Sequence, residues 1–513
     1  MGYNIVMNYN SLPPITRAML KSNSMSKGIL TTEGEIPNIA IINASDTNAS
    51  AVIEMISGGV ISAGGVPNVF AIPPFGLRSR MNPLAGIYEN DFTSATMKMV
   101  AGVLKSNLID GAVLVTDCEV IALGAILGAS QINCPIIVVP THFTRGNFVD
   151  VPFFMGKHHA GHMKMHKDFD GFAKYSTLNH GQGGFKFGST SNTFFAGLEL
   201  MGFVVANGSI IEFGSGAHLD MARRTAQTII DSAKSGLAPK RFITRDSVTN
   251  AVAALLSIDG SVAGMNKISK LLSHCGGKMS HDFINGIAVK TPLLGQIWWD
   301  IYNQGGLVSI VKWLDENTKL IDDNAMTING GKLRDELRAV ETPKIESLAG
   351  ASKMVYIGGN IAEDGAYVHV GADTPMNFSG RAWVYNGVED AAQAILGGAV
   401  EDGVIVLRKC TNTDVTSIVE MISGMTGRSE DNNEVEKSKF AIVTDGYADD
   451  IRGVLVVQMV SSNGYANENF ANIQTGDAIE IDLAKSKLST AVLAKDMKAR
   501  AKKNSTSAPA VHF

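Results

Sequence analysis

The chain has 513 residues, in which 44 lysine and arginine residues stand against 49 aspartate and glutamate residues, for a formal net charge of -5 at pH 7. This near balance excludes a generally basic surface, so nucleic acid is not an expected partner. No stretch approaches the roughly 18 continuous apolar residues of a membrane span, and a chain this long is expected to form two or three domains.

The N-terminal residues MGYNIVMNYNSL lack the charged and apolar regions of a signal peptide, which predicts a cytoplasmic protein. The chain has four cysteines and no Cys-x-x-Cys pair, so reduced thiols are expected in place of a disulfide framework. These cysteines are Cys118, Cys134, Cys275 and Cys410.

The first predicted elements form a strand–helix–strand unit. An apolar run, NIAIIN, predicts a strand over Asn38–Asn43, and polar residues lead from it into a helix over 49–63. Gly64 and Gly65 end that helix before a second strand over 67–72. Such units are typical of a parallel sheet.

A second unit of this kind spans residues 110–140, with strands over 112–115 and 134–139 and a helix over 121–131. Ligands gather beyond the carboxyl end of such a first strand, where the next helix presents unpaired N–H groups. The residues at this point are Thr116, Asp117, Cys118 and Glu119. A cysteine between two carboxylates suits metal or acid/base chemistry; the alternative is an N-capping aspartate beside a small buried thiol.

A segment rich in histidine follows. His158, His162 and His166 recur at a spacing of four, so on a helix they would share one face and could ligate a transition metal. Lysines alternate with them, which fits a solvated or anion-facing surface equally well: Lys157, Lys164 and Lys167. Both interpretations stay open.

A glycine-rich stretch over 181–188 precedes a helix that is predicted to begin near Asn192. It is either a loop that brings backbone donors to an anionic group or an ordinary connection. Residues 219–315 are predicted to be mostly helical, and from Lys353 onward short strands alternate with turns, which predicts a sandwich or barrel. We therefore expect domains at 1–345 and 346–513.

Several motifs, taken in order, resemble one family. They include SAGGVPNVF, the TDCE unit, TSNTFFAGLELMGF, GNIAEDGAYVHVGA and VTDGYADDIRGVLVVQMV. The chain resembles the family of dihydroxy-acid dehydratase and 6-phosphogluconate dehydratase. This resemblance implies an α/β fold with an N-terminal parallel sheet, a C-terminal β-barrel like the swivelling domain of aconitase, and a site between the domains. It also implies a homodimer or dimer of dimers that acts on a small acid.

The resemblance further implies removal of water from a 2,3-dihydroxy acid. In the family an iron–sulfur cluster on three cysteines activates the departing hydroxyl, magnesium binds the carboxylate side, and a serine takes the proton. The family motif Cys-Asp-Lys reads Cys118-Glu119-Val120 here, so the carbamylated lysine that binds magnesium is missing. The other two cluster cysteines fall at about Ala49 and near Phe185, and we expect the usual cluster to be absent.

Other family positions carry new or retained polar residues. Arg78 replaces a magnesium ligand and is predicted to hold a substrate carboxylate or phosphate. Glu420 corresponds to a retained ligand and, with Glu119, could bind magnesium or another divalent cation. Asp449 replaces the serine as a candidate base, or is a solvated turn residue in an inactive site. The other predicted substrate-binding residues are Ser191, Asn192, Asp445 and Arg452.

Three hypotheses about function follow. The preferred one is a hydro-lyase that acts on a hydroxylated carboxylic or sugar acid without the cluster, with Asp449, Cys118 and Glu119 as catalytic residues. The alternative is a catalytically silent homologue that serves as an oligomeric binding or structural protein. A third is a zinc or iron enzyme built from the histidine segment with Cys118.

Overall fold

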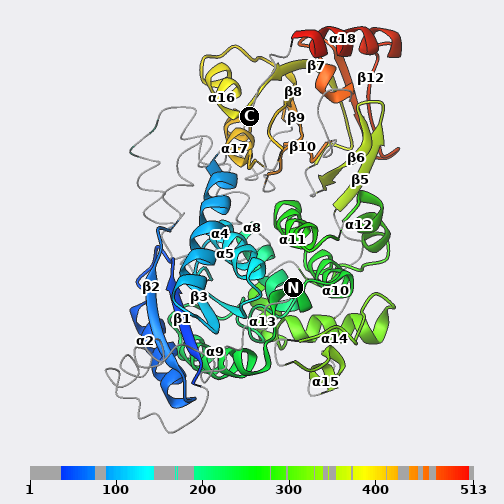
Figure 1. The fold of residues 1–513 in the computed structure, drawn as a ribbon. Helices are drawn as coiled ribbons and strands as arrows, with labels where there is room; N and C mark the ends of the chain where they lie inside the picture. The colour runs from blue at the N-terminus through cyan, green and yellow to red at the C-terminus, as the bar shows by residue number, and fades with distance from the viewer. Residues whose placement is uncertain are drawn as a thin grey trace.

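The computed structural model describes residues 36–74 and 88–143, Asp168, Asp170, and most of 190–507. The longest gaps in the last range are 346–353, 426–437 and 461–468. The described chain forms an α/β part and a β-barrel, and Figure 1 shows the barrel above the α/β part.

The α/β part is built on a parallel sheet with the strand order β2-β1-β3-β4. Its central strand β3 is buried along its whole length because helices cover both faces of the sheet, which explains its continuous apolar run. The strands are β1 (Asn38–Asn43), β2 (Val66–Ala71), β3 (Gly111–Thr116) and β4 (Ile136–Pro140).

Alternate residues of the strands serve two cores. Ile41 and Val113 point to the face covered by α2 (Ser50–Ser62) and α9 (Gly216–Ser235), where they pack in one apolar cluster. The opposite face is covered by α4 (Glu89–Ser106) and α5 (Glu119–Gln131).

Two glycines of α5 set how closely α4 approaches. A Cβ atom at Gly124 would lie 2.6 Å from the carbonyl oxygen of Thr93, and one at Gly128 would lie 2.5 Å from that of Met97. Larger residues at these positions would push the two helices apart, so the four-residue spacing of the glycines fixes the helix pair.

The helical region after the sheet packs around α8 (Thr190–Leu200), which contacts α10 (Arg245–Ser257) and α11 (Val262–His274). Ser261 caps α11 by accepting a hydrogen bond from the Gly264 N–H. The remaining elements are η3 (Pro239–Arg241), α12 (His281–Ala288), α13 (Trp298–Asn303), α14 (Leu307–Asn317) and α15 (Leu333–Arg338).

The C-terminal part is a closed barrel with the strand order β10-β6-β5-β12-β11-β7-β8-β9. This resolves the expected sandwich or barrel in favour of the barrel and confirms the predicted fold class. The strands are β5 (Met354–Gly359), β6 (Ala362–His369), β7 (Asn377–Tyr385), β8 (Gly403–Leu407), β9 (Phe440–Thr444), β10 (Leu455–Gln458), β11 (Ala478–Asp482) and β12 (Lys487–Thr490).

Apolar side chains alternate between the inside and the outside of the barrel. Val404 and Val443 belong to the interior cluster, while Ile405 and Ile442 pack outside against α16 (Val388–Leu396) and α17 (Thr416–Gly424). The boundary predicted near residue 345 lies between α15 and β5 and stays a prediction. Among the described residues, no helix has both the length and the apolarity needed to cross a bilayer.

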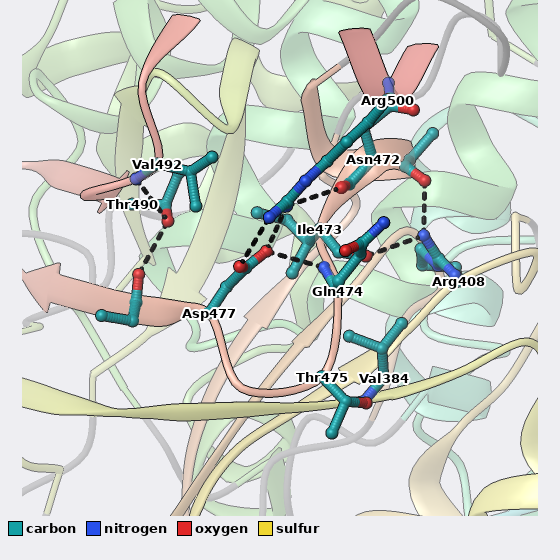
Figure 2. A network of polar contacts seen from close by, with 12 residues as sticks. Val384, Arg408, Asn472, Ile473, Gln474, Thr475, Asp477, Thr490, Val492 and Arg500 are labelled. Atoms are coloured by element: carbon teal, nitrogen blue, oxygen red, sulfur yellow. Dashed lines mark hydrogen bonds and ion pairs between the residues drawn. The ribbon is translucent and has the colours of Figure 1, made fainter. Parts of the chain in front are cut away.

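The final helix, α18 (Ala494–Ser507), is fastened to the barrel by the polar network of Figure 2. Arg500 pairs with both carboxylate oxygens of Asp477, at 2.6 and 3.0 Å, and its Nη1 also donates to the carbonyl of Asn472. Arg408 donates to the carbonyl of Ile473 at 3.0 Å, which fixes the short helix η4 (Asn469–Asn472) beneath α18. The barrel and its last helix are therefore joined by a bidentate ion pair.

Candidate active site between the two domains

The parallel sheet changes its direction of progression between β1 and β3, because the chain moves from β1 outward to β2 and from β3 outward to β4. The crevice outside the carboxyl ends of two such strands is where ligands bind in open α/β sheets. Residues 44–48 follow the end of β1, and residues 117–119 follow the end of β3.

Hydroxyl groups tie the loops at this edge together. The Ser45 Oγ lies 2.7 Å from the Thr47 Oγ1 and 2.7 Å from the Thr141 Oγ1, which follows β4. The buried Thr116 donates to the Ala44 carbonyl at 3.1 Å and accepts from the Cys118 N–H at 3.2 Å. These bonds fix the start of α5.

Cys118 is the N-cap residue of α5, in an extended conformation, and its side chain is buried. The N-cap position belongs to Cys118 and not to Asp117, whose carboxylate accepts a 3.4 Å hydrogen bond from the Asp46 N–H. The thiol is therefore buried, as the structural interpretation of this motif predicted, but the N-cap residue is the cysteine and not the predicted aspartate.

Glu119 is the first residue of α5 and is 2% exposed. It accepts a hydrogen bond of 2.6 Å from the Ser191 hydroxyl at the start of α8, and the positive end of the α5 dipole favours its charge. Asn192 follows Ser191 and is also buried. The structure thus brings together Glu119 and Ser191, two of the residues predicted from the sequence; their roles stay predictions.

A buried cluster joins the helical region to the barrel, and sequence reasoning missed it. The Lys267 Nζ on α11 lies 2.8 Å from the Glu89 Oε1 at the start of α4 and 2.9 Å from the hydroxyl of Tyr447, which follows β9. The Tyr447 hydroxyl also donates to the Glu89 Oε2. The side chains of Lys267 and Glu89 are 1% and 7% exposed, so this ion pair is shielded from water.

Opposing effects act on the pKa of Lys267. Burial alone would lower it, but the negative charges of Glu89, Glu119 and Asp414 outweigh burial and raise the pKa above its ordinary value. The Lys267 ammonium is therefore charged at neutral pH. Because Glu119 and Asp414 both act on it, the edge of the sheet and the barrel share one electrostatic environment.

Lys270 lies one turn further along α11, and its pKa is shifted in the opposite direction to that of Lys267. Burial, and then the positive charge of Lys267, lower the pKa of Lys270 to about 8. Its Nζ lies 5.8 Å from the centroid of the Tyr447 ring, and the side chain is half-buried. α11 thus presents one ammonium that is charged at neutral pH and one whose pKa of about 8 lies close to neutrality.

A second contact holds the start of α11 against the barrel. The His369 Nε2 on β6 lies 2.8 Å from the Asp259 Oδ1, and both side chains are largely buried. Asp259 adopts a left-handed conformation with φ of 59°, two residues before the N-cap of α11. The position of α11 between the two domains is therefore fixed both at its start and at Lys267.

On the barrel side, Asp445 accepts hydrogen bonds from the Cys410 N–H at 3.0 Å and from the Thr411 hydroxyl at 2.8 Å. Burial raises the pKa of Asp445, while these donors act in the opposite direction. Asp445 thus ties together the loops after β8 and β9. Glu420 lies half-buried on α17. Its predicted role as a ligand and the substrate-binding role of Asp445 stay predictions.

Several predicted residues lie outside the described part of the chain, so their roles stay predictions as well: Arg78, Asp449, Arg452, His158, His162 and His166.

The cysteines do not fit a cluster on three thiolates. Cys118 lies at the carboxyl edge of the sheet, whereas Cys134 precedes β4 at the opposite edge. Cys275 ends α11 and Cys410 belongs to the barrel, where burial raises the pKa of its thiol to about 12. Ala49, at the position of the first cluster cysteine, is the buried N-cap of α2.

The family's magnesium site does not fit either. Val120, in place of the carbamylated lysine, is buried in the apolar cluster and offers no ligand atom. In the part of the chain that the structure describes, no group of three or more His, Cys, Asp or Glu side chains is placed to hold a metal ion.

Comparison with known proteins covers nearly the whole chain. The N-terminal model of the dihydroxy-acid/6-phosphogluconate dehydratases matches residues 37–336, and their C-terminal model matches residues 339–512. The dihydroxy-acid dehydratase of Burkholderia mallei (strain SAVP1) is 24% identical over 521 residues, which cover 94% of this chain and 91% of the relative. That of Moorella thermoacetica is 24% identical over 517 residues, covering 92% and 90%. The chain belongs to the dihydroxy-acid/6-phosphogluconate dehydratase family.

Proposed function

We propose that the chain is a hydro-lyase that removes water from a hydroxylated carboxylic or sugar acid between its two domains, without an iron–sulfur cluster. The observation that carries this proposal is the buried cluster of Lys267, Glu89 and Tyr447 between the helical region and the barrel. The charge of Glu119, at the edge of the sheet, also acts on Lys267. The relatives are named dihydroxy-acid dehydratases, which supports water elimination as the reaction class.

Elimination requires a base for the proton beside the carboxylate and an acid for the departing hydroxyl. Asp449, in place of the family serine, accepts the first proton in the proposed reaction. Lys270 donates a proton to the leaving hydroxyl, which departs as water, because its pKa of about 8 leaves it protonated yet acidic near neutral pH. The resulting enol tautomerises to a 2-oxo acid. We assign Glu119 and Cys118, at the start of α5, as the other catalytic residues of this reaction.

The test is a screen of 2,3-dihydroxy acids and aldonic acids for formation of 2-oxo acids by the purified full-length chain. We expect Lys270→Met to lower turnover by about a hundred-fold or more. Lys234→Met is the matched control, since Lys234 is an exposed lysine on α9, and should retain activity. Activity that survives both Glu119→Gln and Asp449→Asn would show that the site is assigned wrongly.

A second candidate function is that of a catalytically silent oligomeric scaffold. It is favoured by Val120, which offers no ligand atom, and by the hydrogen bonds that Lys267, Glu89 and Tyr447 make with one another in the site. Under this hypothesis no acid in the screen is turned over, and Lys270→Met changes nothing. Elemental analysis addresses the third hypothesis, because one tightly held zinc or iron per chain would favour a metal site in the histidine segment.

A further inference from the structure

The region between the domains concentrates negative charge in a place that water hardly reaches. Glu89 and Glu119 are 5% and 2% exposed, and Asp414 lies close enough to act on the same lysine. Buried carboxylates without a nearby positive charge are strongly disfavoured. This region therefore requires a cation.

The chain supplies that cation from α11. The Lys267 ammonium bonds to Glu89 at 2.8 Å and to the Tyr447 hydroxyl at 2.9 Å, and it lies 4.9 Å from the centroid of the Tyr447 ring. The charges of Lys267 and Glu89 both act on Lys270, so Lys270 belongs to the same environment. Together the two ammonium groups carry the charge of one divalent cation.

The resemblance to the dehydratase family implies a magnesium-binding carboxylate at the position of Glu119 and a second magnesium ligand at the position of Val120. Glu119 is held by the Ser191 hydroxyl and acts electrostatically on Lys267. We infer that Lys267, bonded to Glu89 and assisted by Lys270, is a built-in cation that takes the place of a divalent metal ion beside these carboxylates. Lys267 is thus a positioning residue for the carboxylates of the site.

A lysine ammonium and a hard metal ion bind the same carboxylates in different ways. A divalent ion binds several oxygen atoms directly, whereas an ammonium donates three hydrogen bonds and brings one charge on a flexible stem. A metal ion next to the buried Lys267 would also be repelled by it. We therefore expect removal of the Lys267 charge to create affinity for divalent cations.

The experiment is a titration with Mn²⁺, followed by electron paramagnetic resonance, of the chelator-treated full-length chain and three variants. Lys267→Met removes the charge and keeps the volume; Lys267→Gln also keeps a hydrogen-bond donor and serves where Lys267→Met does not fold. Lys234→Met is the control for loss of an exposed lysine. We expect a Lys267 variant to bind Mn²⁺ at least about ten-fold more tightly than the unchanged chain, and Lys234→Met to behave as unchanged.

Two results would overturn the inference. One is stoichiometric, tight Mn²⁺ binding by the unchanged chain that Glu119→Gln abolishes. The other is a folded Lys267 variant with no gain in Mn²⁺ affinity. Neither readout depends on turnover, so failure here is distinguishable from failure of the proposed hydro-lyase activity.

Discussion

Two ion pairs of this chain each hold a helix in place, but in different surroundings. Lys267–Glu89 lies between the domains with side chains 1% and 7% exposed, whereas Arg500–Asp477 fastens α18 with side chains 22% and 11% exposed (Figure 2). The planar guanidinium binds its carboxylate with two parallel bonds, while the ammonium is shared between a carboxylate and a tyrosine.

The two pairs have different roles: Arg500–Asp477 attaches a helix to the barrel, whereas Lys267 neutralises buried carboxylates. Arg500 and Asp477 pair with each other and are partly exposed to solvent. If one of them is replaced, water can therefore hydrate the charge of the other. The Lys267 ammonium acts on the buried Glu89 and Glu119 and on the half-buried Asp414, so its loss leaves two buried carboxylates without this compensating charge. Substitutions in the two regions should therefore differ in size.

The largest effect is expected from Glu89→Gln, which leaves the Lys267 ammonium buried without its nearest charge partner. We expect a loss of about 3–5 kcal/mol in the free energy of unfolding, measured by urea denaturation. The double variant with Lys267→Met should recover much of that loss. Glu54→Gln, on the exposed face of α2, is the control. A loss in Glu89→Gln no larger than that of the control would contradict the role given to the pair.

The buried Glu199 tests burial at a carboxylate that the described residues hold with hydrogen bonds and without an ion pair. Glu199 on α8 accepts hydrogen bonds from the N–H of Asn207 and from the N–H and hydroxyl of Ser209. Burial raises its pKa from 4.5 to about 7, although these donors act in the opposite direction. The folded chain thus holds the Glu199 proton more tightly than the unfolded chain. The stability that this proton contributes is fully present below pH 4.5 and is lost as the pH rises through about 7.

Glu199→Gln should remove this dependence, which amounts to about 3 kcal/mol across that interval. The measurement is the free energy of unfolding at pH values of about 5 and 8, in the unchanged chain and in the variant. If the unchanged chain gained stability over this interval through Glu199, the sign of the pKa shift would be wrong.

Asp477→Asn weakens the bidentate pair with Arg500 at a site that water reaches. We expect a loss of about 1–3 kcal/mol in the free energy of unfolding, and faster amide hydrogen exchange in α18 than elsewhere in the barrel. Asp390→Asn, an exposed carboxylate of α16, is the matched control. Unchanged exchange in α18 would mean that other contacts hold the helix.

The smallest effect is expected from Tyr447→Phe, which keeps the ring beside Lys267 and leaves the ion pair with Glu89 intact. Loss of one hydroxyl that both donates and accepts should cost about 1–2 kcal/mol of unfolding free energy. Thermal unfolding of Tyr447→Phe and of Glu89→Gln under the same conditions shows which variant loses more stability. A larger loss in Tyr447→Phe would reverse the comparison.

Much of the fold is predictable because its signals are local. The buried strand predicted over 38–43 is β1, and the helix predicted over 49–63 is α2 to within one residue at each end. Glycine pairs and apolar runs of the right length carry this information. The barrel order is not local, since β5 pairs with β12 and β6 pairs with β10.

Only the part of the candidate site that follows a strand of the parallel sheet could be predicted from the sequence. Glu119 was predicted because it follows β3, but Glu89, Lys267 and Tyr447 come from three segments that meet only in the fold. One signal was present: Lys267 stands among the apolar residues that α11 buries, where a charged residue is unexpected without a partner. The sequence did not show which partner that would be.

The most direct test is a crystal structure of the full-length chain grown with Mn²⁺ and a 2,3-dihydroxy acid, with an anomalous map at the manganese edge. We expect no manganese peak between Glu89 and Glu119, the Lys267 ammonium bonded to Glu89, and the acid bound beside Lys270. A manganese peak bonded to Glu89 and Glu119, with Lys267 turned away, would contradict this expectation.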